Sequence, residues 1–140
     1  MVNKKAKFNY NILEEYTTGI ILIGSEVKSV RLGHVSMDES YCYFKDGELY
    51  IKNLYIKPYE NSRDGLESTR DRKLLLKKSE LSKLKSTVSE KGLTIVPLVL
   101  KVGARVKVII GVGKGKKLYD KRETIKERDI KKQLARYERV

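Results

Sequence analysis

The sequence has little of the chemistry that catalytic and metal sites use. Its 140 residues contain one cysteine, Cys42, and one histidine, His34. A single cysteine excludes a disulfide within the chain, and these two residues are too few for a zinc site of the usual spacing. We interpret His34 as a surface or turn residue and Cys42, between two tyrosines, as a small buried residue. We therefore expect a protein that is not an enzyme and that uses no metal or cofactor.

Long apolar runs are also missing. No segment of the sequence has the length and hydropathy of a signal peptide or a membrane span. The sequence therefore predicts a cytoplasmic protein with no membrane partner. It gives no sign of a stable oligomer, so we expect a monomer.

Positive charge is abundant. The chain has 31 Lys and Arg against 18 Asp and Glu, a net charge of +13. A chain of this length forms one domain, and so large an excess of one sign indicates a nucleic-acid or anionic-surface binder. Residues 114–140 hold 11 of the cations against 5 acids, so the excess is concentrated at the end of the chain.

Residues 1–113 are patterned as short strands. Apolar residues alternate from Phe8 to Ile12, and Thr17-Thr18-Gly19 predicts a turn before a second strand at Ile20–Ile23. Asp46-Gly47 between two alternating runs predicts a type I′ hairpin. After Asn53 the apolar phase slips, which predicts a bulge or bend that keeps Leu49/Ile51 and Leu54/Ile56 inside.

A second hairpin is predicted around Gly103-Ala104. The strand after it places Val106, Val108, Ile110 and Val112 on one face. Pro97, in the strand before it, has no amide donor, which predicts an edge strand or a bulge there.

Two segments have helix signals. In "GSEVKSVRLG", Ser25 is the predicted cap and Gly33 the predicted stop; in "SELSKLKSTVSEKG", Ser79 and Gly92 have these roles. Leu81, Leu84 and Val88 form the apolar stripe of the second helix. Between them, "RDRKLLL" is predicted to place its cations outside and its leucines inside.

About six short strands with two or three helices predict a mainly β fold. We expect a small closed or partly open antiparallel barrel of the oligonucleotide-binding type, spanning residues 1–113. The pattern also allows an antiparallel sheet with helices on one side. A basic tail, residues 114–140, is expected to follow.

The stretch "GKGKKLYDKRE", residues 113–123, joins the two parts. A phosphate-binding loop of the nucleotide-hydrolase type would need a glycine at Ile110 and a hydroxyl at Lys117, so that motif is absent. We interpret the glycines as a mobile hinge. The basic residues after it are compatible with a solvated tail or with a segment that folds on an anionic partner, and the charge pattern leaves both open.

Four blocks in order along nearly the whole chain resemble the SsrA-binding protein family. They are "NKKAKFNYNILEEYTTGIILIGSEVKSVRLG", "RDRKLLL", "EKGLTIVPL" and "GKGKKLYDKRETIKERD". The resemblance implies an oligonucleotide-binding barrel that binds the transfer-RNA-like domain of transfer-messenger RNA and delivers it to stalled ribosomes in trans-translation. It also implies a tail that is disordered when free and helical in the message channel of the ribosome. A general single-stranded nucleic-acid binder is the alternative.

The resemblance also implies which residues contact RNA. In the barrel they are Asn3, Lys4, Lys5, Glu26, Lys28, Arg72 and Lys73. In the tail the residues expected at the small-subunit decoding centre are Lys116, Lys117, Tyr119, Asp120, Lys121 and Arg122. Cations suit phosphates, and the Tyr119 ring suits stacking on a base. Glu26 has a second interpretation, since it also suits the start of a helix.

The sequence departs from the family pattern at three places. The loop from Glu60 to Thr69 is short and lacks aromatic residues and histidine, the hairpin around Gly103 is trimmed, and "SMDESYC" replaces a more usual Asn-Leu-Lys-Asp-Ser-Tyr run. These changes affect the loops at that end of the barrel and leave the four blocks unchanged. The tyrosines Tyr41, Tyr43, Tyr50 and Tyr55 are compatible with a base-stacking platform or with sheet packing.

Overall fold

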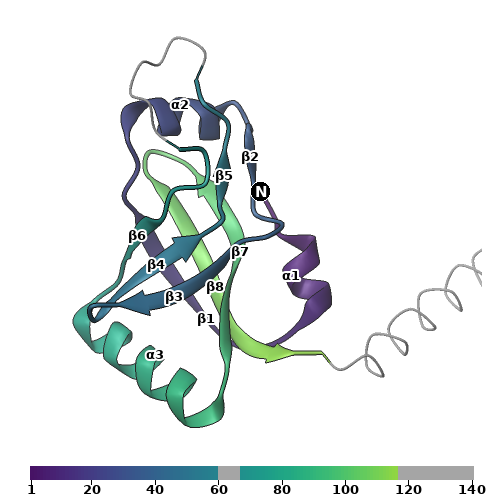
Figure 1. The fold of residues 1–140 in the computed structure, drawn as a ribbon, viewed down its shortest axis with the longest axis vertical. Coiled ribbons are helices and arrows are strands. Elements are labelled where there is room, and N and C mark those ends of the chain that lie inside the picture. The colour runs from purple at the N-terminus through teal and green to yellow at the C-terminus, as the bar shows by residue number, and fades with distance from the viewer. Residues whose placement is uncertain (60–66, 117–140) are drawn as a thin grey trace, which may run out of the picture.

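The computed structural model describes residues 1–59 and 67–116, which form three helices and eight strands. In chain order these are α1 (Lys4–Asn9), β1 (Tyr10–Ile20), α2 (Gly24–Arg31), β2 (Val35–Ser36), β3 (Tyr41–Lys45), β4 (Glu48–Lys52), β5 (Tyr55–Ile56), β6 (Arg72–Leu75), α3 (Lys78–Lys91), β7 (Thr94–Val102) and β8 (Val106–Gly115). Figure 1 shows α2 and α3 at opposite ends of the strands, with α1 at the side.

Six of the strands close into an antiparallel ring. Their order is β1-β6-β4-β3-β7-β8, and β2 and β5 form a separate two-stranded ribbon. The ring is irregular, because β3 and β7 share one residue pair, Cys42 with Ile95. The predicted mainly β fold, a small antiparallel barrel with short helices, is confirmed.

The core fills the inside of this ring. Every second residue of β8 is buried at Val108, Ile110 and Val112, as the alternation predicts. The stripe of α3 also behaves as predicted, since Leu84 is in the core and Leu81 and Val88 pack against it. Cys42 is buried as well, and burial raises the pKa of its thiol.

The turn predictions are largely confirmed. Asp46 and Gly47 have φ of 52° and 78°, as a type I′ hairpin needs. Asn53 has φ 61°, and the bend there leaves both Ile51 and Leu54 buried. The ladder between β7 and β8 shifts register after Pro97, so the proline lies at a bulge inside the sheet.

The predicted turn at Thr17–Gly19 is wrong. β1 runs through it without interruption, and the Thr18 hydroxyl donates a hydrogen bond to the carbonyl of Val108 at 2.8 Å. Gly19 pairs with Lys107 on β8 and with Leu75 on β6, so this segment is where the ring closes. The strand predicted from Phe8 begins later than expected, because residues 4–9 form α1.

Both helices end where predicted, but they begin earlier. Gly33 and Gly92 have φ of 78° and 60°, the left-handed conformation that ends a helix. Ser25 and Ser79 are not the caps, which are Ile23 and Lys77. The amide of the cap residue Ile23 donates to the Glu26 carboxylate at 3.0 Å, so a first-turn acid binds the cap amide in a helix start that lacks a serine cap.

The prediction of a glycine hinge is also wrong. Gly111, Gly113 and Gly115 lie within β8, which is paired with β1 and β7. A Cβ atom on Gly113 would lie 2.2 Å from the carbonyl oxygen of Asn11, and one on Gly111 would lie 2.7 Å from the Leu98 side chain. The glycines therefore allow close packing in a strand that continues to residue 115.

Candidate nucleic-acid interface

A buried cluster of charges joins α2 to β6. Glu26 is 6% exposed and Arg72 is 1% exposed. The Glu26 carboxylate accepts hydrogen bonds from Arg72 Nε at 2.6 Å and from Arg70, which also pairs with its other oxygen. Arg72 donates further to the carbonyls of Leu54 at 2.6 Å and Ser68 at 3.2 Å. The cluster therefore holds together α2, β6, the turn between β4 and β5 at Leu54, and the residues just before β6 at Ser68.

Burial and hydrogen bonds within the cluster shift the pKa values of Glu26 and Arg72. Burial opposes the charge of Glu26, but hydrogen bonds from Arg70, the Ile23 amide and Arg72 outweigh it and hold the pKa of the carboxyl below its usual value. Burial lowers the pKa of Arg72, and its contact with Glu26 counteracts part of that shift. Because the pKa of Glu26 is lowered, its carboxylate is ionised at neutral pH and forms a charged pair with the buried Arg72 guanidinium.

This cluster corrects the prediction for "RDRKLLL". Arg72 points into the protein with Leu74, whereas Leu75 is 49% exposed. The physical reason is that a charge can be buried when a partner charge and enough acceptors surround it. Arg72 was predicted to contact RNA, and the structure places its guanidinium against protein groups.

Asn3 is also buried, at 4% exposure. Its side-chain amide donates to the carbonyls of Pro97 at 2.8 Å and Met37 at 3.4 Å, and its oxygen accepts from the Ala6 amide at 3.2 Å. It is thus the N-cap of α1 and fixes that helix to β7. Both polar atoms of the Asn3 side chain are therefore hydrogen-bonded within the protein.

The predicted lysines lie at the surface. Lys4 and Lys5 are exposed on α1, and Lys5 pairs with Glu39 at 2.8 Å. Lys28, exposed on α2, lies 5.2 Å from the centre of the Tyr59 ring. Lys73 lies on the outer face of β6, opposite Tyr50 and 3.8 Å from Glu48. The structure therefore divides these residues between the α1 side of the barrel and the α2–β6 side (Figure 1).

Tyrosines line the outer face of β3 and β4. The rings of Tyr43 and Tyr50 stack with their centres 6.0 Å apart, and Tyr41 lies 6.5 Å from Tyr43. The Tyr43 hydroxyl donates to Asp71, which raises the pKa of Tyr43 to about 12. These rings point away from the core, so they belong to the surface of the sheet.

Only the first residue of the predicted decoding-centre group lies in the described part of the chain. The amide of Lys116 donates to the carbonyl of Asn9 at 2.8 Å, which ties the end of β8 to the end of α1. Lys117, Tyr119, Asp120, Lys121 and Arg122 lie outside the described residues.

One residue of the buried charge cluster was not predicted from the sequence. Arg70, the second partner of Glu26, is absent from the predicted set, although "RDRK" contains it; only the fold shows that it meets α2.

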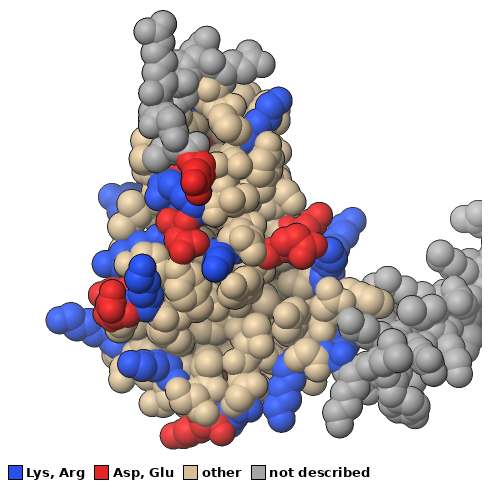
Figure 2. All heavy atoms as spheres, viewed as in Figure 1, with Lys and Arg blue, Asp and Glu red and all other residues tan. Residues whose placement is uncertain are grey.

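Figure 2 shows the cations of one face interspersed with acids instead of gathered in one patch. Within residues 1–59 and 67–116, no group of three His, Cys, Asp or Glu could hold a metal ion. The helices in these ranges are too short or too polar to cross a membrane.

Comparisons with a family model, with related sequences and with solved structures all point to the same protein family. The family model described as SmpB protein matches residues 1–139. The SsrA-binding protein of Chlorobaculum tepidum is 53% identical over 135 residues, covering 94% of this chain and 86% of its own, and that of Bacteroides thetaiotaomicron is 44% identical over 137 residues, covering 96% and 91%. A solved chain described as "tmRNA-SmpB: a journey to the center of the bacterial ribosome" has a TM-score of 0.70 and 47% identity, covering 84% of this chain and 85% of that one. The barrel, the matched sequence and the shared fold together show that this chain belongs to the SmpB family of SsrA-binding proteins.

Proposed function

We propose that this chain is an RNA-binding adaptor that binds the transfer-RNA-like domain of transfer-messenger RNA and delivers it to stalled ribosomes for trans-translation. The observation that carries this proposal is the family match over residues 1–139. The solved relative in the tmRNA-SmpB complex with the bacterial ribosome supports both partners. Such partners place the protein in the cytoplasm, and its role is binding, not catalysis.

The barrel and the tail have different tasks in this proposal. The barrel, predicted as residues 1–113 and extended by β8 to Gly115, binds the transfer-RNA-like domain. The part of the predicted tail, residues 114–140, that follows β8 enters the decoding centre and the message channel, where it forms a helix. Support for the tail's role comes from its charge, since 11 of its residues are Lys or Arg. Lys116, Lys117, Lys121 and Arg122 would meet phosphates there, Tyr119 would stack on a base, and Asp120 would accept from a base or a ribose.

In the barrel, the exposed lysines and the buried residues act differently. Lys4, Lys5, Lys28 and Lys73 contact phosphates directly, since each ammonium reaches the surface. Asn3, Glu26 and Arg72 act as positioning residues, because their polar atoms are bound to protein groups. Glu26 also holds Arg70, whose side chain is 25% exposed and can face RNA.

Deletion of residues 123–140 tests the division of tasks. We expect the shortened protein to bind the isolated transfer-RNA-like fragment within about threefold of the full chain, because in this proposal the barrel supplies the contacts with that fragment. Tagging of stalled chains in a reconstituted translation assay should be lost. A large loss of affinity for the isolated fragment would instead place the tail in the primary RNA interface.

The general single-strand binder is the second candidate, and the outward row of tyrosines is the observation that favours it. Competition separates the two functions. A folded transfer-RNA-like fragment should displace random single-stranded oligonucleotides from the protein at equal salt. Equal affinity for both would refute the adaptor function.

A further inference from the structure

The hairpin that joins β7 and β8 has cations and no acids. Between Glu90 and Asp120 the sequence contains no acidic residue, and Lys101, Arg105 and Lys107 all lie at the hairpin end. None of the three forms an ion pair with a carboxylate in residues 1–59 or 67–116. The acids of the neighbouring strand β1, Glu14 and Glu15, pair with Val112 and Gly111, which puts them about 13–17 Å along β8 from Lys107. Among the described residues, those that line the hairpin end therefore include no acid that would neutralise this positive charge.

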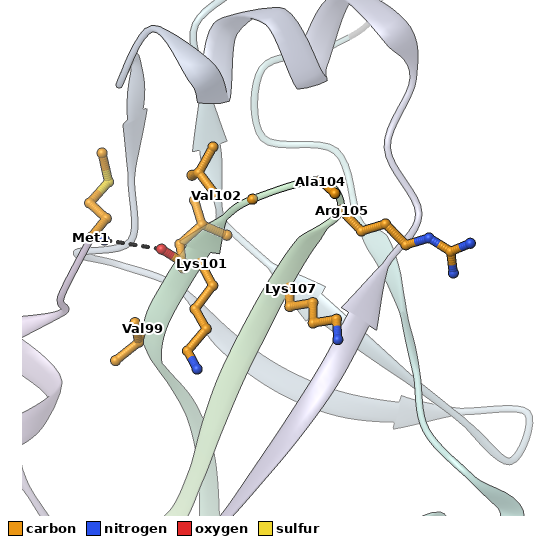
Figure 3. Close-up of a pocket in the computed structure, with 9 residues that line it drawn as sticks. Met1, Val99, Lys101, Val102, Ala104, Arg105 and Lys107 are labelled. Atoms are coloured by element: carbon orange, nitrogen blue, oxygen red, sulfur yellow. Dashed lines mark hydrogen bonds between the residues drawn. The ribbon is translucent and has the colours of Figure 1, made fainter.

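Two of these cations form a like-charged pair. Lys101 and Lys107 are direct cross-strand partners, and the next residue in the row, Gly19 on β1, has no side chain to cover them. Figure 3 shows both side chains extending in the same direction from neighbouring strands. Like charges that face each other across strands destabilise a sheet, so an anion between them would remove a cost that the free protein bears. Flexible lysine stems let both ammonium groups reach one phosphate oxygen cluster.

The surface around this pair is hollowed on both sides of the hairpin. One hollow of about 770 Å³ is lined by Lys101 and Lys107 together with Val99, Val102 and Ala104 (Figure 3). A second, of about 460 Å³, lies between the hairpin, α2 and the exposed Leu75, and Arg31 and Lys107 line it. Arg105 lines both hollows, and in Figure 3 it points away from Lys101. The apolar lining can contact the carbon atoms of a ribose while the cations bind the phosphates.

One of these cations is held in place. Arg31, the last residue of α2, donates to the carbonyl of Gly103 in the hairpin turn at 3.1 Å. Its guanidinium is thus fixed beside Arg105 and Lys107 instead of extending freely into solvent. A guanidinium with a fixed position suits phosphate recognition better than a mobile one.

We propose that the end of the β7–β8 hairpin, with Lys101, Arg105, Lys107 and the α2 residue Arg31, is a phosphate-binding site for the backbone of the transfer-RNA-like domain. The inference rests on the proposed function and names the surface that it uses. The position of the hairpin relative to the start of the tail indicates which RNA is bound. β8 is ten residues long, so the hairpin lies about 30 Å from Gly115, where the chain leaves the barrel toward the tail. In the proposed function the tail is directed to the ribosome, so the hairpin, at the opposite end of β8, is free to bind the carried RNA.

The test is the double substitution Lys101→Gln/Lys107→Gln in the full chain. Affinity for a transcript of the transfer-RNA-like domain is measured by filter binding from about 0.05 to about 0.4 M KCl. Over this range the release of counterions makes affinity fall steeply with salt. Because the two lysines meet one phosphate between them, their loss should reduce the slope of log K against log salt by about 0.7–0.9 and should weaken binding about 5- to 8-fold at about 0.1 M salt. The melting temperature should stay the same or rise, because the substitution removes a like-charged pair.

Lys83→Gln/Lys85→Gln is the matched control. It removes the same charge from two exposed residues of α3, at the other end of the barrel (Figure 1). We expect it to change affinity less than about threefold, the effect of a distant charge screened by salt. Equal effects of the two double variants, or an unchanged salt slope in the hairpin variant, would overturn the inference.

Two further arms separate the possible failures. If the unaltered protein does not bind the transcript, the proposed function itself fails. If it binds and the hairpin variant binds equally well, only the hairpin site is refuted. Binding of both proteins to vacant ribosomes is measured in parallel. A loss confined to ribosomes would mean that the hairpin meets ribosomal RNA and would also overturn the inference.

Discussion

Removal of the Glu26 carboxylate should be one of the most damaging single changes in the barrel. In Glu26→Ala, Arg72 keeps its charge with a fully buried side chain, and among the described residues only the carbonyls of Leu54 and Ser68 remain as its partners. Breaking a buried ion pair by removing one partner costs about 3–5 kcal/mol, because the other charge stays buried without compensation. For a domain of this size that corresponds to a drop in melting temperature of about 10–20 °C.

Urea unfolding followed by circular dichroism measures this cost. Glu80→Ala is the matched control, since Glu80 accepts from the amide of Lys77 at 3.4 Å as Glu26 does from Ile23, but it holds no buried arginine. The control should lose about 0.5–1 kcal/mol. Combining Glu26→Ala with Arg72→Met should recover most of the loss, because neither charge then remains. A loss of less than about 1 kcal/mol in Glu26→Ala, or fully additive losses in the double variant, would refute the reasoning.

Three other results are expected. Glu26 has a lowered pKa in the folded state, so its stabilisation is complete above the unfolded value of about 4.5 and disappears as pH falls through the folded pKa; the difference in unfolding free energy between the unaltered protein and Glu26→Gln should therefore shrink below about pH 4. Gly113→Ala should lose about 3 kcal/mol because its Cβ meets the Asn11 carbonyl, whereas Gly103→Ala, with no atom closer than 4.0 Å, should be tolerated; equal effects would contradict the packing argument. The Cys42 thiol should react with Ellman's reagent only after denaturant is added, and rapid labelling of the folded protein would show that it is accessible.

Local signals in the sequence predicted much of this fold. Asp46-Gly47 specified a hairpin because few residue pairs adopt two positive φ angles, and Gly33 and Gly92 ended their helices for the same reason. The alternation in β8 and the stripe of α3 identified the core, since burial follows strand and helix periods. In each case the deciding interaction lies within a few residues along the chain.

The predictions that failed depend on partners far away in the sequence. Arg72 points inward because Glu26, 46 residues earlier, meets it there, and "RKLLL" alone fits either phase of a strand. Gly113 looked like a hinge residue, but its small size serves a contact with Asn11. The cations of the β7–β8 hairpin went unnoticed because their significance lies in cross-strand pairing and in the distance that the register leaves between them and the acids of the neighbouring strand.

The closure of the sheet restricts how a partner can dock. Beside its single pair with β3, β7 is covered by the first residues of the chain: Val2 bridges to Val99, and the Asn3 amide donates to the carbonyl of Leu98 at 2.7 Å. The first residues of the chain therefore occupy backbone groups of β7 that an extended peptide would need for β-augmentation there. Recognition at this part of β7 relies on side chains. Partner choice can thus change by surface substitution alone, with the hydrogen-bonded ring left as it is.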